Sequence, residues 1–397
     1  MHVGFLFNHY VPHQVPHAAP YAFELSRLHD DLCVTIACST HDELEASMAI
    51  GARYPGHRCT FVRLKVPWHC HLRDVWHAGQ SFKRKRWVLQ NNGDFFASLD
   101  VLVSPEKNCL KLKSMHKLDQ LKFIHTRHGA GDAAAAFDER CRAFDFLLLP
   151  GEKYADRLKA QDWLQSSDYA VVGYPKFEVF DAPRQRRRKL FGNDNPVVVY
   201  NPHFDERISS WQSVGLKVLD FFIENKDYNL IFAPHVVLFK RHKRHGAMLP
   251  RHYEHHDNIL IDKGSIASAD MTYMMAADIY LGDVSSQVYE FLIQPRPCIF
   301  LSPYKLRWKD DRNYENWQLG QVVDDVDTGL RASLDRAPDV QPTYAARQVE
   351  AFHKTFRIEP DSTAASRGAR AIAEFLNLGS QSREDAACRT EELRYSA

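Results

Sequence analysis

Two short segments contain the residue types that could do chemistry, and each follows an apolar run. In the first, residues 127–132 (RHGAGD), the imidazole of His128 stands next to Gly129, which lets a substrate approach the backbone. An imidazole titrates near neutral pH, so His128 could remove a proton from an acceptor hydroxyl as a general base. A turn histidine held by the backbone fits the same pattern, because the third glycine of a dinucleotide-binding fingerprint is missing. In either interpretation the segment predicts a loop at the carboxyl end of a strand, where open α/β folds bind ligands.

The second segment, residues 282–290 (GDVSSQVYE), has the order strand, acidic turn, paired hydroxyls and helix. The hydroxyls of Ser285 and Ser286, with the N–H groups of a helix start, could bind phosphates. Asp283 would order the turn, and Glu290, about one helical turn further, could accept hydrogen bonds from ribose hydroxyls. An ordinary serine N-cap with a solvated Glu290 is the alternative. The Gly-x-Ser-x-Gly pattern of serine hydrolases is absent, which argues against a serine nucleophile.

A third candidate, His235, ends the apolar run 229–233 and could hold a diphosphate, although a loop histidine would look the same. Six histidines lie between residues 235 and 256, but they lack accompanying carboxylates and a His-Glu-x-x-His pattern. The pair Asp325 and Asp327 lies in a polar stretch far past the serines, and we interpret it as a solvated turn. We therefore expect neither a metal ion nor a cofactor.

The composition narrows the class of protein. The formal net charge of +1 argues against a dedicated nucleic-acid binder, although residues 83–86, 184–189 and 240–244 are dense basic clusters. Such clusters are solvated faces or linkers, or they serve anionic substrates at an anionic membrane. The eight cysteines form no Cys-x-x-Cys pair, which favours reduced thiols. No signal peptide or spanning stretch is apparent, so we expect a cytoplasmic protein whose membrane contact, if any, is peripheral.

Apolar, β-branched runs alternate with helical patterns along most of the chain, which predicts an α/β fold with parallel sheets. The polar, basic and turn-rich residues 176–196 interrupt this alternation and are predicted to be an interdomain linker. We therefore expect two α/β domains of similar size, over 1–175 and 197–378. The latter would end in two helices, over 347–356 and 362–378, and residues 379–397 would form a polar tail.

An ordered set of motifs between residues 120 and 305 resembles the CDP-glycerol glycerophosphotransferase family of teichoic-acid-type polymerases. The matching positions are His128-Gly129, Gly173-Tyr174-Pro175, Pro234-His235, Gly282-Asp283-Val284-Ser285-Ser286, Tyr289-Glu290 and Pro297. The resemblance implies a GT-B fold, in which two Rossmann-like domains face a cleft. The N-terminal domain would lie on the acceptor side, and the C-terminal domain would hold the nucleotide donor. It also implies metal-independent transfer of a polyol phosphate from a CDP-activated donor to a hydroxyl of a cell-surface glycan or lipid-linked acceptor.

In this family context we expect His128 to be the base, with Gly129 beside it in the donor site. His235, Ser285 and Ser286 would hold the diphosphate. The sequence departs from the family pattern at Ala130, where a threonine is usual. It also departs at Ala233 and Val284, in two other motifs. A GT-B glycosyltransferase that uses a nucleotide sugar remains the second interpretation, and a non-catalytic module that binds nucleotides or glycans the third.

Overall fold

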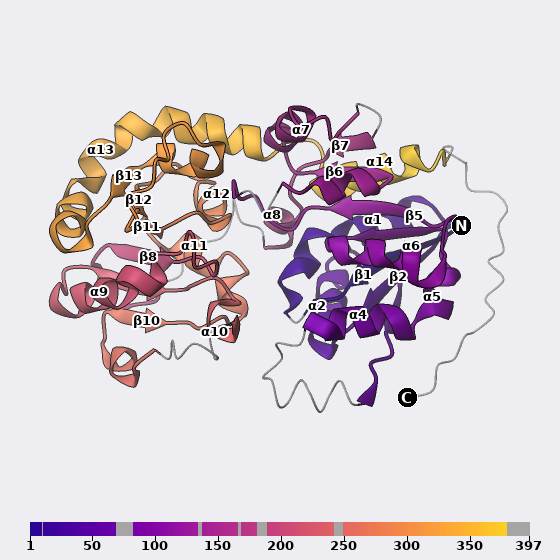
Figure 1. Cartoon of the computed structure of the whole chain (residues 1–397), viewed down its shortest axis with the longest axis horizontal. Coiled ribbons are helices and arrows are strands. Elements are labelled where there is room, and N and C mark those ends of the chain that lie inside the picture. Colours follow the sequence, from indigo (N-terminus) through magenta and orange to yellow (C-terminus); the bar gives the residue numbers. More distant parts are fainter. Residues whose placement is uncertain are drawn as a thin grey trace.

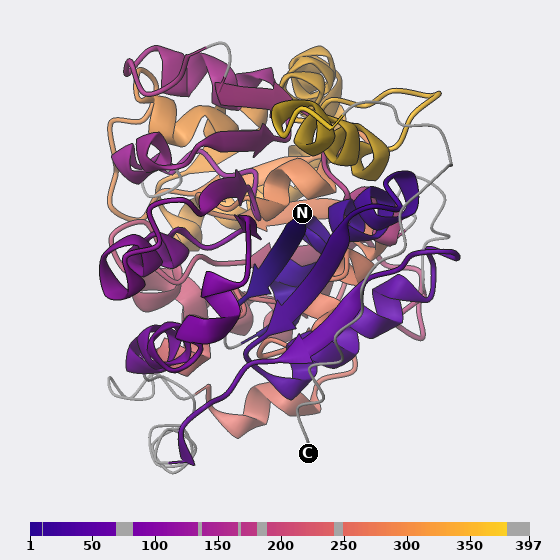
Figure 2. The same ribbon diagram turned by 90° about the vertical axis from the view of Figure 1, so that its right-hand side faces the viewer.

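The structure, a computed structural model, describes residues 1–9, 11–68, 82–133, 137–165, 168–180, 189–241 and 249–378. Two open sheets form the centres of two halves that lie side by side (Figure 1). Figure 2, turned by 90°, shows the first half in front of the second. Every strand pairing in both sheets is parallel.

The first sheet has the strand order β3-β2-β1-β4-β5-β6-β7. Its strands are β1 (His2–Phe7), β2 (Cys33–Cys38), β3 (Thr60–Arg63), β4 (Val101–Ser104), β5 (Lys122–Thr126), β6 (Phe146–Leu149) and β7 (Tyr169–Val171). All four residues of β4 and of β6 are buried. Helices cover both faces of a parallel sheet, and this is why the strands are apolar runs rather than alternating ones.

The second sheet repeats this arrangement with the order β10-β9-β8-β11-β12-β13. Its strands are β8 (Val197–Asn201), β9 (Asn229–Phe232), β10 (Ile259–Ile261), β11 (Ile279–Gly282), β12 (Cys298–Leu301) and β13 (Gln321–Val323). In each sheet the strand order reverses beside the first strand, between β1 and β4 and between β8 and β11. The loops that leave the carboxyl ends of strands at such a switch point form the usual ligand crevice of an open α/β fold.

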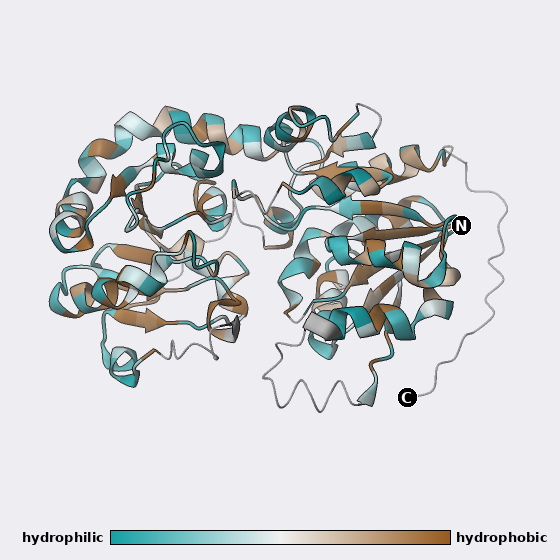
Figure 3. Cartoon of the chain, viewed as in Figure 1, coloured by the Kyte–Doolittle hydropathy of each residue, from teal (hydrophilic) through white to brown (hydrophobic). Residues whose placement is uncertain are grey.

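The helices lie on the outside of the two sheets, and Figure 3 shows mostly hydrophobic strands between helices that carry both hydrophilic and hydrophobic residues. They are α1 (Ala19–Leu28), α2 (His41–Gly51), α4 (Phe82–Asn91), α5 (Gly93–Ala97), α6 (Lys111–His116), α7 (Glu152–Lys159), α8 (Lys176–Val179), α9 (Trp211–Glu224), α10 (Leu238–Arg241), α11 (Thr272–Ala276), α12 (Gln287–Phe291), α13 (Val326–Thr355) and α14 (Ala364–Phe375). Short 3₁₀ helices complete the loops: η1 (Pro12–His17), η2 (Lys107–Leu110), η4 (Glu139–Ala143), η7 (Arg251–His255), η8 (Ile266–Ser268) and η9 (Arg312–Leu319). Within the described ranges, no helix combines the length and apolar character needed to cross a membrane.

The long helix α13 joins the two halves, and its course differs from the sequence prediction. It begins at Val326 rather than near residue 347, because the side chain of Asp325 caps it by accepting from the Asp327 N–H. The predicted solvated turn at Asp325 is therefore a helix start. At its other end α13 contacts α7 of the first half, where a Cβ on Gly151 would lie 2.2 Å from the Thr355 carbonyl oxygen. Only glycine permits this approach of the two backbones.

The last helix, α14, also differs from the expected division of the chain. The sequence places it in the second half, but it packs against α1 of the first half, where Gly368 lies against the ring of Tyr21. The first residues of the predicted linker likewise form α8, with Phe177 and Val179 buried in the core. Residues 181–188 of the linker and the tail over 379–397 lie outside the described residues. The chain therefore crosses between the halves at α8 and again after α13.

Candidate active site

A cavity of about 650 Å³ lies between the two halves, at the carboxyl ends of both sheets. One wall comes from the segments that follow β1, β4 and β5. The opposite wall comes from the segments that follow β8, β9, β11 and β12. Both switch points thus open into the same space.

His128, which follows β5, is exposed on the first wall of this cavity. Its Nδ1 lies 2.9 Å from the carbonyl oxygen of Pro105. A carbonyl can only accept, so Nδ1 carries the proton and the lone pair of the neutral ring is on Nε2. The protein around the ring removes solvent that would stabilise the charged form, and this desolvation lowers the pKa of His128. The carboxylate of Glu106 partly opposes the effect. The neutral imidazole required of a base is therefore favoured at neutral pH.

The two predicted motifs meet across the cavity. A Cβ added to Gly129 or Gly131 would lie 3.5 Å from atoms of Ser286, which follows β11 in the other half. At the end of the same loop, the buried carboxylate of Asp132 accepts from the Tyr289 hydroxyl at 2.6 Å and from the Asn316 N–H at 3.0 Å. Both donors belong to the second half. The loop that carries His128 is thus fastened to the wall it faces.

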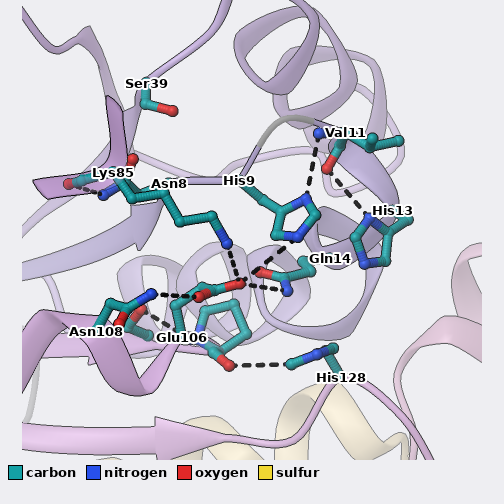
Figure 4. Close-up of polar contacts among 12 residues, drawn as sticks. Asn8, His9, Val11, His13, Gln14, Ser39, Lys85, Glu106, Asn108 and His128 are labelled. Carbon is teal, nitrogen blue, oxygen red and sulfur yellow. Dashed lines mark hydrogen bonds and ion pairs between the residues drawn. The ribbon is translucent and has the colours of Figure 1, made fainter. Parts of the chain in front are cut away.

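Glu106 is the centre of the polar contacts behind His128 (Figure 4). Its carboxylate accepts from Lys85 Nζ at 2.9 Å, from Gln14 Nε2 at 2.9 Å and from Asn108 Nδ2 at 3.4 Å. Pro105, which holds the His128 ring, is the preceding residue in the chain. The position of the imidazole therefore depends on this partly buried network.

On the opposite wall, Ser286 and His235 line the cavity. Ser285, in contrast, is 4% exposed and is not part of the cavity lining. Its hydroxyl donates to Asn201 Oδ1 at 2.7 Å. The Ser285 hydroxyl also accepts from the Gln287 N–H at 3.3 Å. The helix that follows, α12, is shorter than expected and spans only Gln287–Phe291. Of the two serines, Ser286 is the one that lines the cavity.

Asp283 is fully buried and orders the loop that follows β8. Its Oδ1 accepts from the His203 N–H at 2.8 Å, and its Oδ2 accepts from the Ser210 N–H at 2.6 Å and the Ser210 hydroxyl at 2.9 Å. Burial raises the pKa of Asp283 to about 7, while these hydrogen bonds act in the opposite direction. His203 lines the cavity, so Asp283 acts on the site through the loop it holds.

Glu290 lines the cavity but already has partners. Its Oε1 accepts from the Tyr174 hydroxyl at 2.8 Å, and Lys176 Nζ lies 2.8 Å and 2.7 Å from its two oxygens. Both side chains come from the segment that ends the first half. Glu290 is therefore part of a buried ion pair between the halves rather than a solvated residue.

Several cavity residues were not singled out by the sequence patterns. They are His9, His13, His17, Lys107, Arg127, Arg140 and Arg207. The histidines recur every four residues after β1, a spacing that is visible in the sequence. The cations are scattered over three loops, and only the fold brings them to one cavity. Their abundance makes the cavity suited to an anionic ligand.

Comparisons with known structures establish the class of fold. The chain is similar to the wall teichoic acid polymerase TagF, with a TM-score of 0.60 and 15% identity over 94% of this chain and 89% of that chain. A histidine variant of TagF soaked with CDPG gives a TM-score of 0.57 and 16% identity over 95% and 89% of the two chains. UDP-GlcNAc 2-epimerase from Neisseria meningitidis, bound to UDP-GlcNAc, gives 0.52 and 10% over 95% and 100%. Together with the two facing parallel sheets, these matches define a GT-B protein.

A family model identifies the particular group within this fold. Residues 80–374 match the model described as CDP-Glycerol:Poly(glycerophosphate) glycerophosphotransferase. A search of curated protein sequences finds no match. The chain belongs to the CDP-glycerol:poly(glycerophosphate) glycerophosphotransferase family and is a transferase, as its motifs predict.

Proposed function

We propose that this transferase moves glycerol phosphate, or a similar polyol phosphate, from a CDP-activated donor to a hydroxyl of a cell-surface glycan or lipid-linked acceptor. The observation that carries the proposal is the imidazole of His128, whose Nε2 carries the lone pair. His128 lines the same cavity as Ser286 of the other half, which lies against the neighbouring Gly129. The family membership supports the identity of the donor.

In the proposed step, the acceptor hydroxyl oxygen attacks the β-phosphorus of the CDP-polyol. The proton of that hydroxyl passes to Nε2 of His128, a new P–O bond forms, and the P–O bond to CMP breaks. CMP leaves with the bonding electrons, and the product is a phosphodiester. The Pro105 carbonyl accepts from Nδ1 before and after the transfer, so it stabilises the imidazolium that forms.

The donor would lie against the second wall. His235 and Ser286 are proposed to hydrogen-bond the diphosphate, and Asp283 and Ser285 to hold the turn that presents them. Backbone N–H groups and cations of the cavity would offset the charge that develops on CMP, without a metal ion. The Glu290 carboxylate, oriented by Lys176, is proposed to reach the ribose hydroxyls, with Gly129 part of the donor site beside Ser286.

We place the reaction in the cytoplasm, at the inner face of the plasma membrane, where a nucleotide-activated donor and a lipid-linked acceptor meet. Nucleotide selectivity tests the proposal directly. CDP-glycerol or CDP-ribitol should raise the unfolding temperature of the purified protein, whereas UDP-N-acetylglucosamine at the same concentration should not. Selective stabilisation by the UDP-sugar would support a glycosyltransferase instead. Stabilisation by CDP-glycerol with no nucleotide release for any acceptor would support a binding module.

A further inference from the structure

The loop that carries the proposed base, residues 127–132, is held along its backbone by α7 of the first half. Lys153 Nζ donates to the Ala130 carbonyl oxygen at 3.2 Å. Arg157, one helical turn further along α7, donates from Nη1 to the Asp132 carbonyl oxygen at 2.9 Å. The first half therefore fixes the course of the loop but leaves the carboxylate of Asp132 for other contacts.

The side chain of Asp132 links this loop to the second half. Its Oδ1 accepts from Lys153 Nζ at 3.0 Å, and its Oδ2 accepts from the Tyr289 hydroxyl at 2.6 Å and from the Asn316 N–H at 3.0 Å. Asp132 is 1% exposed and Tyr289 is 2% exposed. A buried carboxylate with charged and neutral donors on both oxygens is a rigid junction, because losing any donor leaves charge unsatisfied.

The bond between Asp132 and Tyr289, which we call the clasp, has a fixed direction. Burial raises the pKa of Tyr289 well above its usual range, and the carboxylate of Asp132 adds to this effect. The phenol therefore keeps its proton and donates it to the carboxylate, and hydrogen bonds to a charged acceptor are the stronger kind. Lys153 Nζ also lies 3.5 Å from the centroid of the Tyr289 ring, so one cation contacts both partners of the clasp.

The clasp connects the base to the segment proposed to hold the donor. Tyr289 lies in α12, three residues after Ser286 and directly before Glu290. At the start of this segment, a Cβ on Gly131 would lie 3.5 Å from the Ser286 backbone nitrogen. The loop and the donor segment therefore touch at Ser286 and are bonded at Tyr289. Tyr289 itself is not part of the cavity lining.

We propose that Asp132 and Tyr289 are positioning residues, which set the place of His128 relative to a donor held at Ser286 without touching either substrate. A misplacement of a reacting group by about 1 Å can cost about 100-fold in rate, so even a modest loosening of the loop should be measurable. This inference rests on the proposed transfer reaction and adds two buried residues to the groups on which its rate depends.

The test is Tyr289→Phe in the whole protein, with CDP-glycerol as donor and glycerol as acceptor. The variant loses one hydroxyl and keeps the ring that contacts Lys153. The kcat for CMP release should fall by about tenfold, and the KM for CDP-glycerol should stay within about twofold of wild type. A kcat equal to that of wild type would overturn the proposal.

Tyr273→Phe is the matched control. Tyr273 is also buried, and its hydroxyl donates to a carboxylate oxygen, Asp262 Oδ2, at 2.8 Å. Both partners belong to the second half, so this bond does not reach the loop. Tyr273→Phe should leave kcat within about twofold of wild type. A tenfold loss in both variants would show that the effect does not belong to the clasp.

A double variant separates positioning of the base from general support of the fold. In a His128→Gln enzyme there is no base to position, so adding Tyr289→Phe should lower the remaining kcat by less than about twofold. A loss of about tenfold in both backgrounds would mean that Tyr289 acts independently of His128, and the proposal would be wrong.

Hydrogen exchange gives a measurement that does not depend on activity. Backbone amides of residues 127–132 should exchange at least about fivefold faster in Tyr289→Phe than in wild type or Tyr273→Phe, because the loop opens more often. If the proposed transfer is wrong, wild-type protein releases no CMP from CDP-glycerol, and exchange still decides whether the clasp holds the loop. If only the clasp is wrong, CMP is released, and Tyr289→Phe matches wild type in both kcat and loop exchange.

Discussion

The two walls of the cavity come from sheets of the same strand order, but they use their polar side chains in different ways. On the first wall, partly buried contacts converge on Glu106 and leave the ring of His128 exposed to the cavity. On the second wall, the carboxylate of Asp283 and the hydroxyl of Ser285 bond inward and order the backbone, so that Ser286 and His235 face the cavity. We therefore expect substitutions on the first wall to lower the turnover rate. Substitutions on the second wall should lower the stability of the fold and the affinity for the donor.

The largest effect is expected on the first wall. His128→Gln should lower kcat by about 100-fold or more, because the proton acceptor is lost, and should leave the affinity for CDP-glycerol nearly unchanged. Single-turnover kinetics and calorimetry measure the two quantities. His2→Gln is the matched control, since His2 makes the same Nδ1-to-carbonyl contact, with Ser98, at the amino end of β1. Near wild-type turnover of His128→Gln would remove the base from the account.

The next effect concerns the second wall. Asp283→Asn should destabilise the fold by about 1–3 kcal/mol, because the asparagine NH₂ must face an N–H or hydroxyl that now donates to the carboxylate. Donor affinity should fall with it, whereas the turnover of donor-saturated enzyme should fall much less. Chemical denaturation and donor titration would measure both. If Asp283→Asn folds and binds the donor normally but has no turnover, the proposed difference between the two walls would be wrong.

Two substitutions that change the charge beside His128 can test whether this imidazole is the base on the first wall. A base must be neutral, so kcat/KM should fall as the pH drops through the pKa of His128, which lies below its ordinary value. Glu106→Gln removes a negative charge that favours the imidazolium and should move this acid limb to lower pH by about one unit. Lys85→Met removes a positive charge and should move the limb to higher pH.

The other charged and titratable groups near His128 are unchanged in both variants: Arg127, His9, His13 and His17. Structural damage alone would lower activity at every pH. Limbs that shift in the same direction would show that the titrating group is not the imidazole beside Glu106.

The smallest effect separates the two serines. Ser286→Ala should weaken donor binding by about 1 kcal/mol, because one hydrogen bond to phosphate is lost. Ser285→Ala should lower stability by a similar amount and change donor affinity little, because its hydroxyl pairs with Asn201. Calorimetry with CDP-glycerol compares the variants directly. A larger affinity loss in Ser285→Ala would reverse the assignment.

The sequence predicted the parallel α/β fold because the buried strands are uninterrupted apolar runs, as in β4 and β6. It missed β13, which has only three residues and begins with a glutamine. It also assigned α14 to the wrong neighbour, since amphipathic spacing indicates that a helix buries a face but not against which sheet.

The site was predicted unevenly for a similar reason. The motif residues around His128 and Ser286 follow β5 and β11, which belong to different sheets. In each parallel sheet the carboxyl ends of the strands lie at one edge, so the sequence could predict that each motif lies at a ligand-binding edge. Whether Ser285 faces inward depends on backbone angles that the sequence does not specify. The histidines after β1 are evenly spaced, but their place in the same cavity lining as Glu106 follows from the pairing of β1 with β4, which is not a local property of the chain.

The identity of the released nucleotide tests the central claim most directly. Purified enzyme would be incubated with CDP-glycerol and glycerol in the presence of EDTA, and the nucleotides separated by chromatography. Attack at the β-phosphorus predicts CMP in equal amount to a new phosphodiester detected by ³¹P NMR. Release of CDP, which would show attack at carbon, or a dependence on added Mg²⁺ or Mn²⁺, would contradict the account.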